Sequence, residues 1–366
     1  MKAAVVDTPG GGFTVQDIDI AEPAGREVLV EVRAAGLCHT DLTLAGQSTS
    51  PYPPPVVLGH EIAGVVIAVG PHATDFTAGD HVVGCLVQWC GTCPACRDDR
   101  PYQCHRPGAT LRDPGRDGLP RLSRDGHRVT QGMGLGGFAQ RALVHENQLT
   151  AVPRSLPAAS AALLGCAVLT GAGSALNAAR IREGDTVAVI GAGGVGLNTI
   201  AAVERAGASR VVAVDVHDVR LRRARAFGAT DVVNSATTDV VTAVRDLTGG
   251  GVRHAFDVVG TAATADRALR MTASGGDVYV VGLAGGGTGE LSLSLPRLLL
   301  QQKRIQGLIM GSATPRRDIP HYAELYLRGR MNLDDLVSRR IALDEIDAGY
   351  AALRDPEVAR VVVTSF

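Results

Sequence analysis

A glycine run, Gly191-Ala192-Gly193-Gly194-Val195-Gly196, restricts the fold more than any other feature of the sequence. It directly follows a strand-like run at residues 186–190 and opens a helical stretch that extends to residue 206, before Gly207. In such a unit the first glycine permits the turn, the second lets the backbone approach a pyrophosphate, and the third lets the helix pack against the strand. The helix N-terminus offers free N–H donors to a phosphate. The run therefore predicts a dinucleotide-binding fold.

Asp215 supports this interpretation and indicates which dinucleotide binds. It ends the next strand-like run, at about the 20-residue distance that the glycine fingerprint requires. Its carboxylate can accept hydrogen bonds from both adenosine ribose hydroxyls, and its charge would repel a 2′-phosphate. We therefore expect NAD rather than NADP. The alternative, a purely structural glycine turn, is disfavoured because the run lies within a βαβ unit.

The pattern of apolar runs divides the chain, whose 366 residues are too many for one ordinary core. Up to about residue 158, short apolar runs are separated by Gly and Pro turns, which is typical of a β-rich domain. From about residue 180, strand-like and helical runs alternate, which predicts a doubly wound parallel sheet. After about residue 311 we expect helices at 321–328 and from Asp344, then a strand at 359–364. The expected strands are 3–6, 28–32, 62–69, 81–83, 139–144, 186–190, 211–214, 231–234, 255–259, 278–281 and 305–309.

Composition excludes several classes of partner. The formal net charge is −1 and charged residues make up 20% of the chain, so neither nucleic acid nor a membrane surface is expected to bind. The N-terminus lacks the apolar core of a signal peptide. Residues 158–179 are apolar, but glycines and Asn177 interrupt them, so we interpret them as a core helix rather than a membrane span. We expect a soluble, cytoplasmic protein.

Clustered cysteines in a chain without a secretory signal indicate a metal site rather than disulfides. Four of the seven cysteines lie close together, in Cys90-Gly91-Thr92-Cys93-Pro94-Ala95-Cys96 and at Cys104. Four thiolates at this spacing can close a tetrahedral structural zinc site, which has no open position for chemistry. A 4Fe–4S cluster is the alternative, but His105 rather than proline follows the fourth cysteine. Cys85 is left over and is expected in the core.

A second set of donors suits a catalytic metal. Cys38-His39-Thr40-Asp41 follows a strand-like run, and His60 and Cys166 stand beside glycines. We interpret Cys38, His60 and Cys166 as one zinc site with an open fourth position, and Asp41 as the carboxylate that orients a ligand imidazole. Because the three donors are far apart in the sequence, spacing alone does not exclude that they are unrelated core residues.

Over nearly its full length the chain resembles the zinc-dependent medium-chain alcohol dehydrogenase family. The motifs that carry the resemblance occur in the expected order: Cys38-His39-Thr40-Asp41, Gly59-His60-Glu61, the four-cysteine lobe, Leu164-Gly165-Cys166, and the glycine run with Asp215. The resemblance implies an α/β protein with a GroES-like β-rich catalytic domain (residues 1–167, with the zinc lobe at about 88–110), a doubly wound parallel Rossmann domain (168–310), and a C-terminal return to the catalytic domain (311–366). The edge region 278–309 and the long lobe resemble dimeric relatives, so we expect a homodimer.

The resemblance also implies roles for particular residues. Two zinc ions are expected per chain. Catalytic zinc is held by Cys38, His60 and Cys166, with Glu61 as an occasional extra ligand, and structural zinc by Cys90, Cys93, Cys96 and Cys104. NAD is contacted by His39 and Arg360 at the pyrophosphate, Thr170 at the nicotinamide, Arg220 and Asp215 at the adenosine ribose, and the glycine run, Gly191, Gly193, Gly194, Val195 and Gly196. For Arg220 and Arg360 the alternative is solvated surface charge.

The implied reaction is reversible hydride transfer between a primary or secondary alcohol and NAD, giving an aldehyde or ketone. Zinc as a Lewis acid lets a bound alcohol lose its proton near neutral pH, and Thr40 accepts that proton in a short hydrogen bond and passes it to the nicotinamide ribose. Many relatives have a histidine three residues after this threonine, where this chain has Thr43, so we expect proton release through water or Thr43. Leu86 stands where relatives often have an aromatic ring, and with Leu283 it is expected to line a pocket for bulky or aromatic alcohols.

Two other functions are compatible with part of the sequence. A glutathione- or mycothiol-dependent formaldehyde dehydrogenase shares Cys-His-Thr-Asp, but the glutathione form has an arginine four residues after the last lobe cysteine. Here that position is Gly108, and Arg106 is out of step with it. A non-catalytic, zinc-stabilised dinucleotide-binding protein is the other alternative, disfavoured because the complete catalytic ligand set is retained.

Overall fold

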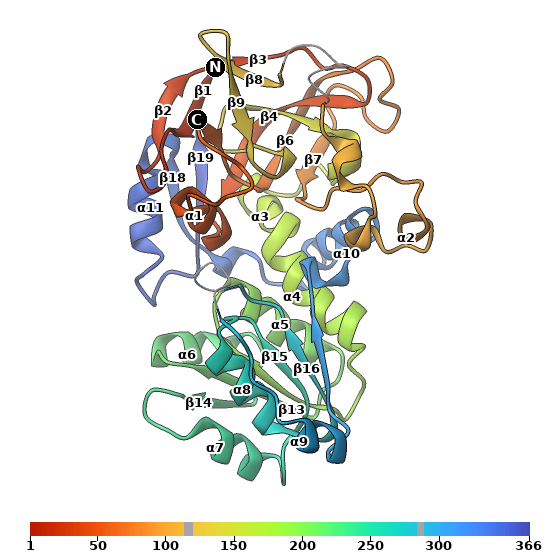
Figure 1. The fold of residues 1–366 in the computed structure, drawn as a ribbon, viewed down its shortest axis with the longest axis vertical. Coiled ribbons are helices and arrows are strands. Elements are labelled where there is room, and N and C mark those ends of the chain that lie inside the picture. Colours follow the sequence, from red (N-terminus) through yellow and green to blue (C-terminus); the bar gives the residue numbers. More distant parts are fainter. Residues whose placement is uncertain (113–119, 284–288) are drawn as a thin grey trace. The chain divides into compact units, whose positions relative to one another are not determined.

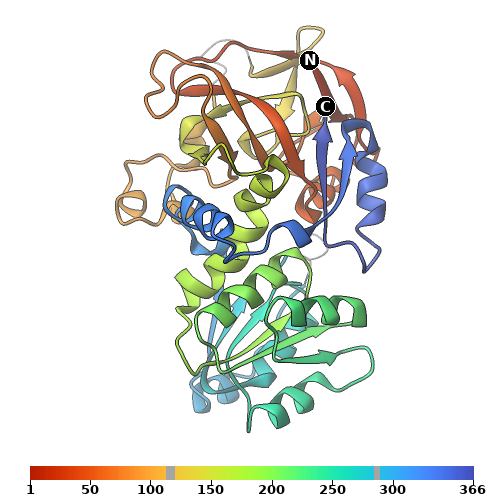
Figure 2. The ribbon, with the colours of Figure 1, turned by 180° about the vertical axis from the view of Figure 1, so that it is seen from behind.

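The computed structural model describes residues 1–112, 120–283 and 289–366. Contacts divide the chain into two compact units: a β-rich unit, Met1–Cys166 with Thr314–Phe366, and a Rossmann unit, Ala167–Ala313. The boundaries between the units thus lie at residues 166/167 and 313/314, whereas the sequence predicts 167/168 and 310/311. The C-terminal segment returns to the β-rich unit, where helix α11 lies beside strands β18 and β19 (Figure 2).

The β-rich unit consists mainly of two sheets (Figure 1). Among the described residues the first runs β2-β1-β5-β9-β8-β3, and the second runs β11-β7-β6-β4-β19-β18 with β10 also paired to β4. The strands are β1 (Lys2–Val6), β2 (Thr14–Asp17), β3 (Asp19–Ile20), β4 (Glu27–Gly36), β5 (Val56–Val57), β6 (Glu61–Val69), β7 (His81–Gly84), β8 (Leu122–Arg124), β9 (His127–Gln131), β10 (Arg141–His145), β11 (Leu149–Ala151), β18 (Val337–Ala342) and β19 (Arg360–Ser365).

The longest strand, β4, organises this unit because it pairs with β6, β10 and β19. Its β-branched side chains suit a pleated, buried surface, and Val28, Val30 and Val32 are fully or almost fully buried. Burying each such side chain contributes about 2 kcal/mol of hydrophobic free energy. The helices of the unit are α1 (His39–Gly46), α2 (Pro94–Arg97), α3 (Ala158–Leu163), α10 (Pro315–Leu327) and α11 (Ile346–Ala352).

The Rossmann unit contains a parallel sheet in the order β14-β13-β12-β15-β16-β17. This confirms the predicted doubly wound sheet, and the order reverses direction at β12, the strand that precedes the glycine run. Its strands are β12 (Thr186–Ile190), β13 (Arg210–Asp215), β14 (Asp231–Asn234), β15 (Val252–Asp257), β16 (Thr272–Val280) and β17 (Arg304–Gly307). Its helices, which cover both faces of the sheet (Figures 1 and 2), are α4 (Leu169–Gly173), α5 (Gly194–Arg205), α6 (Asp218–Ala226), α7 (Val240–Leu247), α8 (Ala262–Met271) and α9 (Leu295–Leu300).

The structure differs from several of the predicted element boundaries; strand β16, for example, begins at Thr272 rather than at residue 278. Two of the differences have a clear local cause. Helix α10 begins at Pro315, not at residue 321 as predicted, because proline suits the first turn and Pro320 is accommodated inside the helix. Strand β15 ends at Asp257, before the predicted end at residue 259, because the Asp257 carboxylate accepts hydrogen bonds from the N–H groups of Val259 and Gly260. These bonds turn the chain out of the sheet.

One helical run of the described chain, Ala158–Ala179, is long and apolar enough to cross a membrane by length and composition, but 94% of its apolar window is buried in the protein. Such burial is expected of a core helix. The run is not a regular α-helix throughout, because π-helical turns at Leu164–Val168 and Ser174–Ala179 interrupt it.

Candidate active site and metal centres

Cys38 lies where β4 passes into α1. It is the N-cap residue of α1, with an extended backbone (φ −115°, ψ 143°). The preceding residue, Leu37, is held on both sides: its N–H donates to Val361 O at 2.9 Å, and its carbonyl accepts from Arg360 Nη1 at 3.2 Å. The Cys38 backbone is thus fixed between a strand end and a helix start.

His60 immediately precedes β6 and is fully buried. The turn before it requires glycine, because Gly59 has a φ of +96° and a Cβ there would lie 2.6 Å from the N atom of Phe138. Asp41 fixes this turn and the imidazole together: its Oδ1 accepts from Gly59 N at 2.9 Å, and its Oδ2 lies 2.8 Å from His60 Nδ1. This contact leaves His60 Nε2 for a metal ion.

Cys166 completes the group from a π-helical turn, a local irregularity that is frequent at functional sites. Its Sγ lies 3.2 Å from His60 Nε2. One ligand atom each of Cys38, His60, Glu61 and Cys166 lies within 4.8 Å of the other three. The structure therefore brings Cys166 to Cys38, His60 and Glu61, although Cys166 is 106 residues away from His60 in the sequence.

The charges of this cluster are strongly coupled. A hydrogen bond from Cys166 lowers the pKa of Cys38 well below its usual value, and the same bond, with burial, raises the pKa of Cys166. Burial alone would lower the pKa of His60, but Asp41 and Cys38 hold it well above the ordinary value. Burial raises the pKa of Glu61 to about 7, partly offset by Arg360, whose Nη1 lies 3.4 Å from Glu61 Oε1. A shared cation would relieve this crowding of acidic groups.

The donor set fits Zn²⁺. Two sulfurs, one imidazole nitrogen and one carboxylate oxygen are ligands that zinc accepts in a tetrahedral arrangement. Within the described residues, neither carboxylate oxygen of Glu61 accepts a hydrogen bond, although both are buried. Buried polar atoms without such partners are uncommon, and a metal ion would satisfy them. If Glu61 did not bind the metal, Cys38, His60 and Cys166 would remain as three protein ligands, and the fourth position would be free for a substrate oxygen.

The lobe cysteines form a second, closed cluster. One sulfur each of Cys90, Cys93, Cys96 and Cys104 lies within 4.8 Å of the other three. All four are free, and the 3.5 Å between the sulfurs of Cys93 and Cys96 is too long for a disulfide. Cys90 Sγ accepts from Cys93 N at 3.3 Å, and Cys104 Sγ accepts from Cys90 N at 3.2 Å. Such N–H···S bonds stabilise thiolates, and the N–H of Thr92 helps to lower the pKa of Cys90 to about 5.

The glycine run has the geometry of a dinucleotide-binding turn. Gly191 has a φ of +96°, and a Cβ on Gly196 would overlap the carbonyl oxygen of Gly191. A Cβ on Gly193, the N-cap of α5, would in contrast meet nothing within 4 Å. Asp215 Oδ2 accepts from Ala192 N at 2.9 Å, so the carboxylate is held beside the turn.

The other residues expected to bind cofactor or substrate lie in varied surroundings. Thr170 is buried in the Rossmann unit and donates to Met310 Sδ at 3.6 Å, and Arg220 Nη1 lies 4.0 Å from Asp215 Oδ2. His39 is exposed in the first turn of α1. Arg360 is buried, so the alternative of solvated surface charge is wrong for it.

The two expected pocket residues differ in exposure. Leu86 is half-buried and packs against the core of the β-rich unit, whereas Leu283, in the Rossmann unit, is 72% exposed. Thr40, the expected proton acceptor, lies 3.6 Å from Cys38 Sγ through its hydroxyl oxygen. The roles of these residues stay predictions.

Tyr350 also contacts the site, although it was not predicted as a site residue. Its hydroxyl donates to the carbonyl of Cys38 at 3.1 Å, from a position 312 residues away in the chain. The local sequence of Tyr350 contains no motif that could have indicated this contact.

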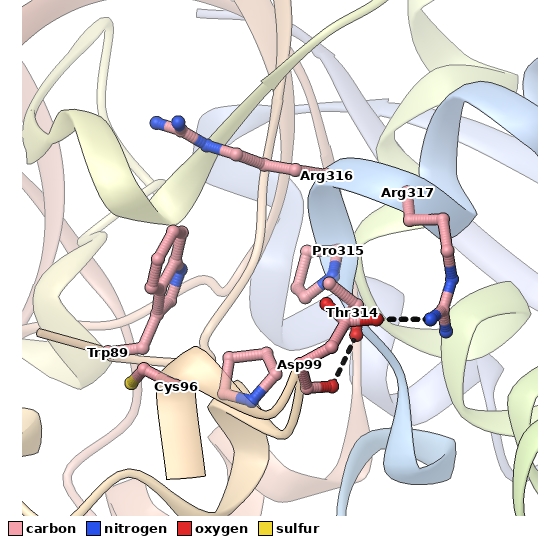
Figure 3. Close-up of a pocket in the computed structure, with 8 residues that line it drawn as sticks. Trp89, Cys96, Asp99, Thr314, Pro315, Arg316 and Arg317 are labelled. Atoms are coloured by element: carbon pink, nitrogen blue, oxygen red, sulfur yellow. Dashed lines mark hydrogen bonds and ion pairs between the residues drawn. The ribbon is translucent and has the colours of Figure 1, made fainter. Parts of the chain in front are cut away.

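A separate cavity of about 370 Å³ lies in the β-rich unit, between the cysteine lobe and the start of α10 (Figure 3). Its charged groups are already paired: Arg317 with Asp99, and Arg316 with Asp75 at 2.7 Å. The guanidinium of Arg316 also lies 5.4 Å from the Trp89 ring centroid. The lining residues are Trp89, Cys96, Asp99, Pro101, Thr314, Pro315, Arg316 and Arg317. We assign no ligand to it because its charges are balanced within the protein.

A dinucleotide-type fold joined to a buried Cys₂His–carboxylate cluster and a Cys₄ cluster defines the class of zinc-binding oxidoreductases. Comparisons with known proteins agree. Residues 24–154 match the alcohol dehydrogenase GroES-like domain, and residues 194–328 match the zinc-binding dehydrogenase family. The chain belongs to the zinc-dependent medium-chain alcohol dehydrogenase family.

Curated relatives match along the whole chain. An NDMA-dependent alcohol dehydrogenase of Amycolatopsis methanolica is 38% identical over 99% of this chain and 98% of the relative. An S-(hydroxymethyl)glutathione dehydrogenase of Escherichia coli is 33% identical over 99% of both chains. Among solved structures, benzyl alcohol dehydrogenase of Acinetobacter calcoaceticus is 34% identical, with a TM-score of 0.92 over 100% of this chain and 99% of that chain. These likenesses confirm the expected family and the combination of a GroES-like and a Rossmann domain.

Proposed function

We propose that the protein is an NAD-dependent zinc alcohol dehydrogenase that interconverts a primary or secondary alcohol and its aldehyde or ketone. The observation that carries the proposal is the buried cluster of Cys38, His60, Glu61 and Cys166, whose ligand atoms lie within 4.8 Å of one another. Glu61 is the ligand that can be exchanged, since it is a carboxylate held by Arg360 rather than a thiolate.

When bound, zinc would supply Lewis-acid polarisation of the substrate oxygen. The protein then has to remove the alcohol proton. We assign this to Thr40, whose hydroxyl is at the exposed start of α1 and beside Cys38 Sγ. The hydroxyl would accept the alcohol proton while it passes its own proton on, so Thr40 stays neutral. Thr43 follows one helical turn later on α1, so the two hydroxyls share a face and offer a route for the proton towards water. NAD, when bound, would accept the hydride from the alcohol carbon.

Asp215 supports NAD over NADP. It is 7% exposed, and its oxygens accept from the backbone N–H groups of Ala192 and His217. Each carboxylate oxygen retains a lone pair that can accept from a ribose hydroxyl. A 2′-phosphate at the same place would meet this negative charge at close range.

For the substrate, we propose a bulky or aromatic alcohol. Leu86 is smaller than the aromatic ring that relatives often place there, and a structural neighbour is named a benzyl alcohol dehydrogenase. Thiol-dependent formaldehyde oxidation is the second candidate, suggested by the name of the Escherichia coli relative. Against it, position 108 is glycine, and Arg106 Nη2 already donates to Thr92 Oγ1 at 2.6 Å in the lobe. We further propose a cytoplasmic homodimer that binds neither nucleic acid nor membrane.

A substrate panel tests the proposal. We expect NADH formation with benzyl-type alcohols, slower turnover of ethanol, and no stimulation of formaldehyde oxidation by glutathione or mycothiol. Cys38→Ser should lower the rate by more than about 100-fold, because it removes a metal ligand rather than a supporting group. Cys85→Ala is the matched control, since Cys85 is fully buried outside both clusters. Turnover with NDMA alone, or with NADP but not NAD, would contradict the assigned cofactor use. A thiol requirement would favour the second candidate.

A further inference from the structure

Helix α11 packs directly on the backbone that carries Cys38. Gly349 makes this approach possible: a Cβ there would lie 2.7 Å from Leu37 Cδ2 and 2.8 Å from Ile341 Cδ1. Because glycine leaves room for Leu37, the next residue of the helix, Tyr350, comes within hydrogen-bond distance of Cys38. Helix α11 therefore contacts the proposed catalytic metal site through the backbone carbonyl of Cys38, one of the proposed zinc ligands.

Two donors converge on one carbonyl. The Cys38 carbonyl accepts from Asp41 N within α1 at 3.1 Å and from Tyr350 Oη at 3.1 Å. The first of these bonds belongs to the start of the helix and would be present without Tyr350. The second is a tether between distant parts of the chain, and it lies in a protected place, since Tyr350 is 5% exposed.

Aromatic contacts fix the ring of Tyr350. It stacks on Phe13, with ring centroids 5.5 Å apart and planes at 22°, and Phe13 meets Phe138 edge-on at 5.7 Å. Phe138 packs against Gly59, the residue before His60. Asp347, on the same helix as Tyr350, accepts from Phe13 N at 3.1 Å. The hydroxyl is thus presented by a rigid aromatic group rather than by a mobile side chain.

We propose that Tyr350 is a positioning residue that holds Cys38 Sγ in place for the metal, and this inference rests on the proposed metal site. A cysteine has one rotatable bond between its backbone and its sulfur, so a shift of the Cys38 peptide passes directly to Sγ. By fixing that peptide, the Tyr350 hydroxyl keeps Sγ close to His60 and Cys166. Groups that orient metal ligands in this way typically change metal affinity or activity by about 10- to 100-fold when they are removed.

Tyr350→Phe tests this because it removes the hydroxyl and keeps the ring. The Cys38 carbonyl still accepts from Asp41 N, so the variant should fold. Zinc release from the purified protein is followed with a chromogenic chelator, which should give two phases, one for each metal centre. The phase that Cys38→Ser abolishes belongs to the catalytic centre. We expect Tyr350→Phe to accelerate that phase by about tenfold, the effect of losing one hydrogen bond, and to leave the lobe phase unchanged.

The lobe phase is an internal control, because the lobe belongs to the same β-rich unit. Tyr326→Phe is the matched variant: it removes a hydroxyl that donates to Asp334, which belongs to neither metal cluster, and it should change neither phase. Equal acceleration of both phases by Tyr350→Phe, or no acceleration at all, would overturn the positioning role. A wild-type protein that releases only one zinc ion per chain, in a phase that Cys38→Ser leaves unchanged, would instead contradict the metal site on which the inference rests.

Discussion

Two glycines of the dinucleotide-binding turn, Gly193 and Gly196, differ in the space that is available for a side chain. At Gly196 a Cβ would overlap the Gly191 carbonyl, whereas at Gly193 it would enter open space. The Gly193 backbone (φ −83°, ψ −168°) also suits any residue. Gly196 is therefore required for packing within the protein, whereas a need for glycine at position 193 would come from a bound ligand.

We expect Gly196→Ala to lower the free energy of unfolding by about 2 kcal/mol through overpacking. Gly193→Ala should leave stability within about 0.5 kcal/mol of the wild type, since nothing is displaced. If a pyrophosphate occupies the space beside Gly193, the same methyl group should weaken NADH binding by about tenfold. Urea unfolding and NADH fluorescence titration measure the two effects. Unchanged NADH affinity in Gly193→Ala would contradict the assigned pyrophosphate position.

At the scale of single residues, the sequence predicts those whose role can be recognised from neighbouring residues in the chain. Cys90, Cys93 and Cys96 have the spacing of metal ligands. The glycine run is recognisable because a strand-like run precedes it and a helical stretch follows it. Cys38, His60 and Cys166 could be grouped only as a hypothesis, because no spacing rule joins them. Tyr350 could not be found at all, since a hydroxyl that donates to a distant carbonyl has no sequence pattern.

Secondary-structure elements position the candidate site through their ends and irregularities. Cys38 lies between a strand and a helix, His60 comes one residue before β6, and Cys166 stands in a π-helical turn. Alternation and apolar runs predicted most of the strands because burial sets that pattern. They did not predict the π-helical turns, which depend on tertiary packing, or the start of α10 at Pro315.

The edge of the Rossmann sheet carries the proposed dimer contact. Among the described residues, β17 pairs only with β16, and neighbouring α9 exposes Leu295, Leu299 and Leu300 by 72%, 76% and 80%. An unpaired strand edge beside exposed leucines is a surface that a second copy would cover.

We expect the double variant Leu299→Glu/Leu300→Glu to shift the protein from dimer to monomer, because it places charge in an apolar interface. Sedimentation velocity measures the change. Leu327→Glu is the control, since Leu327 is a helical leucine of the β-rich unit that is 39% exposed. A wild-type monomer, or a double variant that remains dimeric, would show that this edge is not the interface.

The β-rich unit is built from two segments of the chain, one before and one after the Rossmann unit. The Rossmann unit is inserted between Cys166 and Thr314, so the last proposed zinc ligand is the last residue of the first segment. The shift from β-rich to alternating pattern predicted two domains of these kinds. The returning segment was expected only from the family resemblance, because its own pattern does not show which domain it joins.

We propose that one zinc ion binds between Cys38, His60 and Cys166 in the active protein. The most direct measurement is an anomalous difference map from crystals of the active protein, recorded at the zinc absorption edge. We predict two peaks per chain, one at bonding distance from those three ligand atoms and one among the four lobe sulfurs. A single peak, in the lobe only, from crystals whose dissolved protein oxidises alcohols at the full rate would contradict the account.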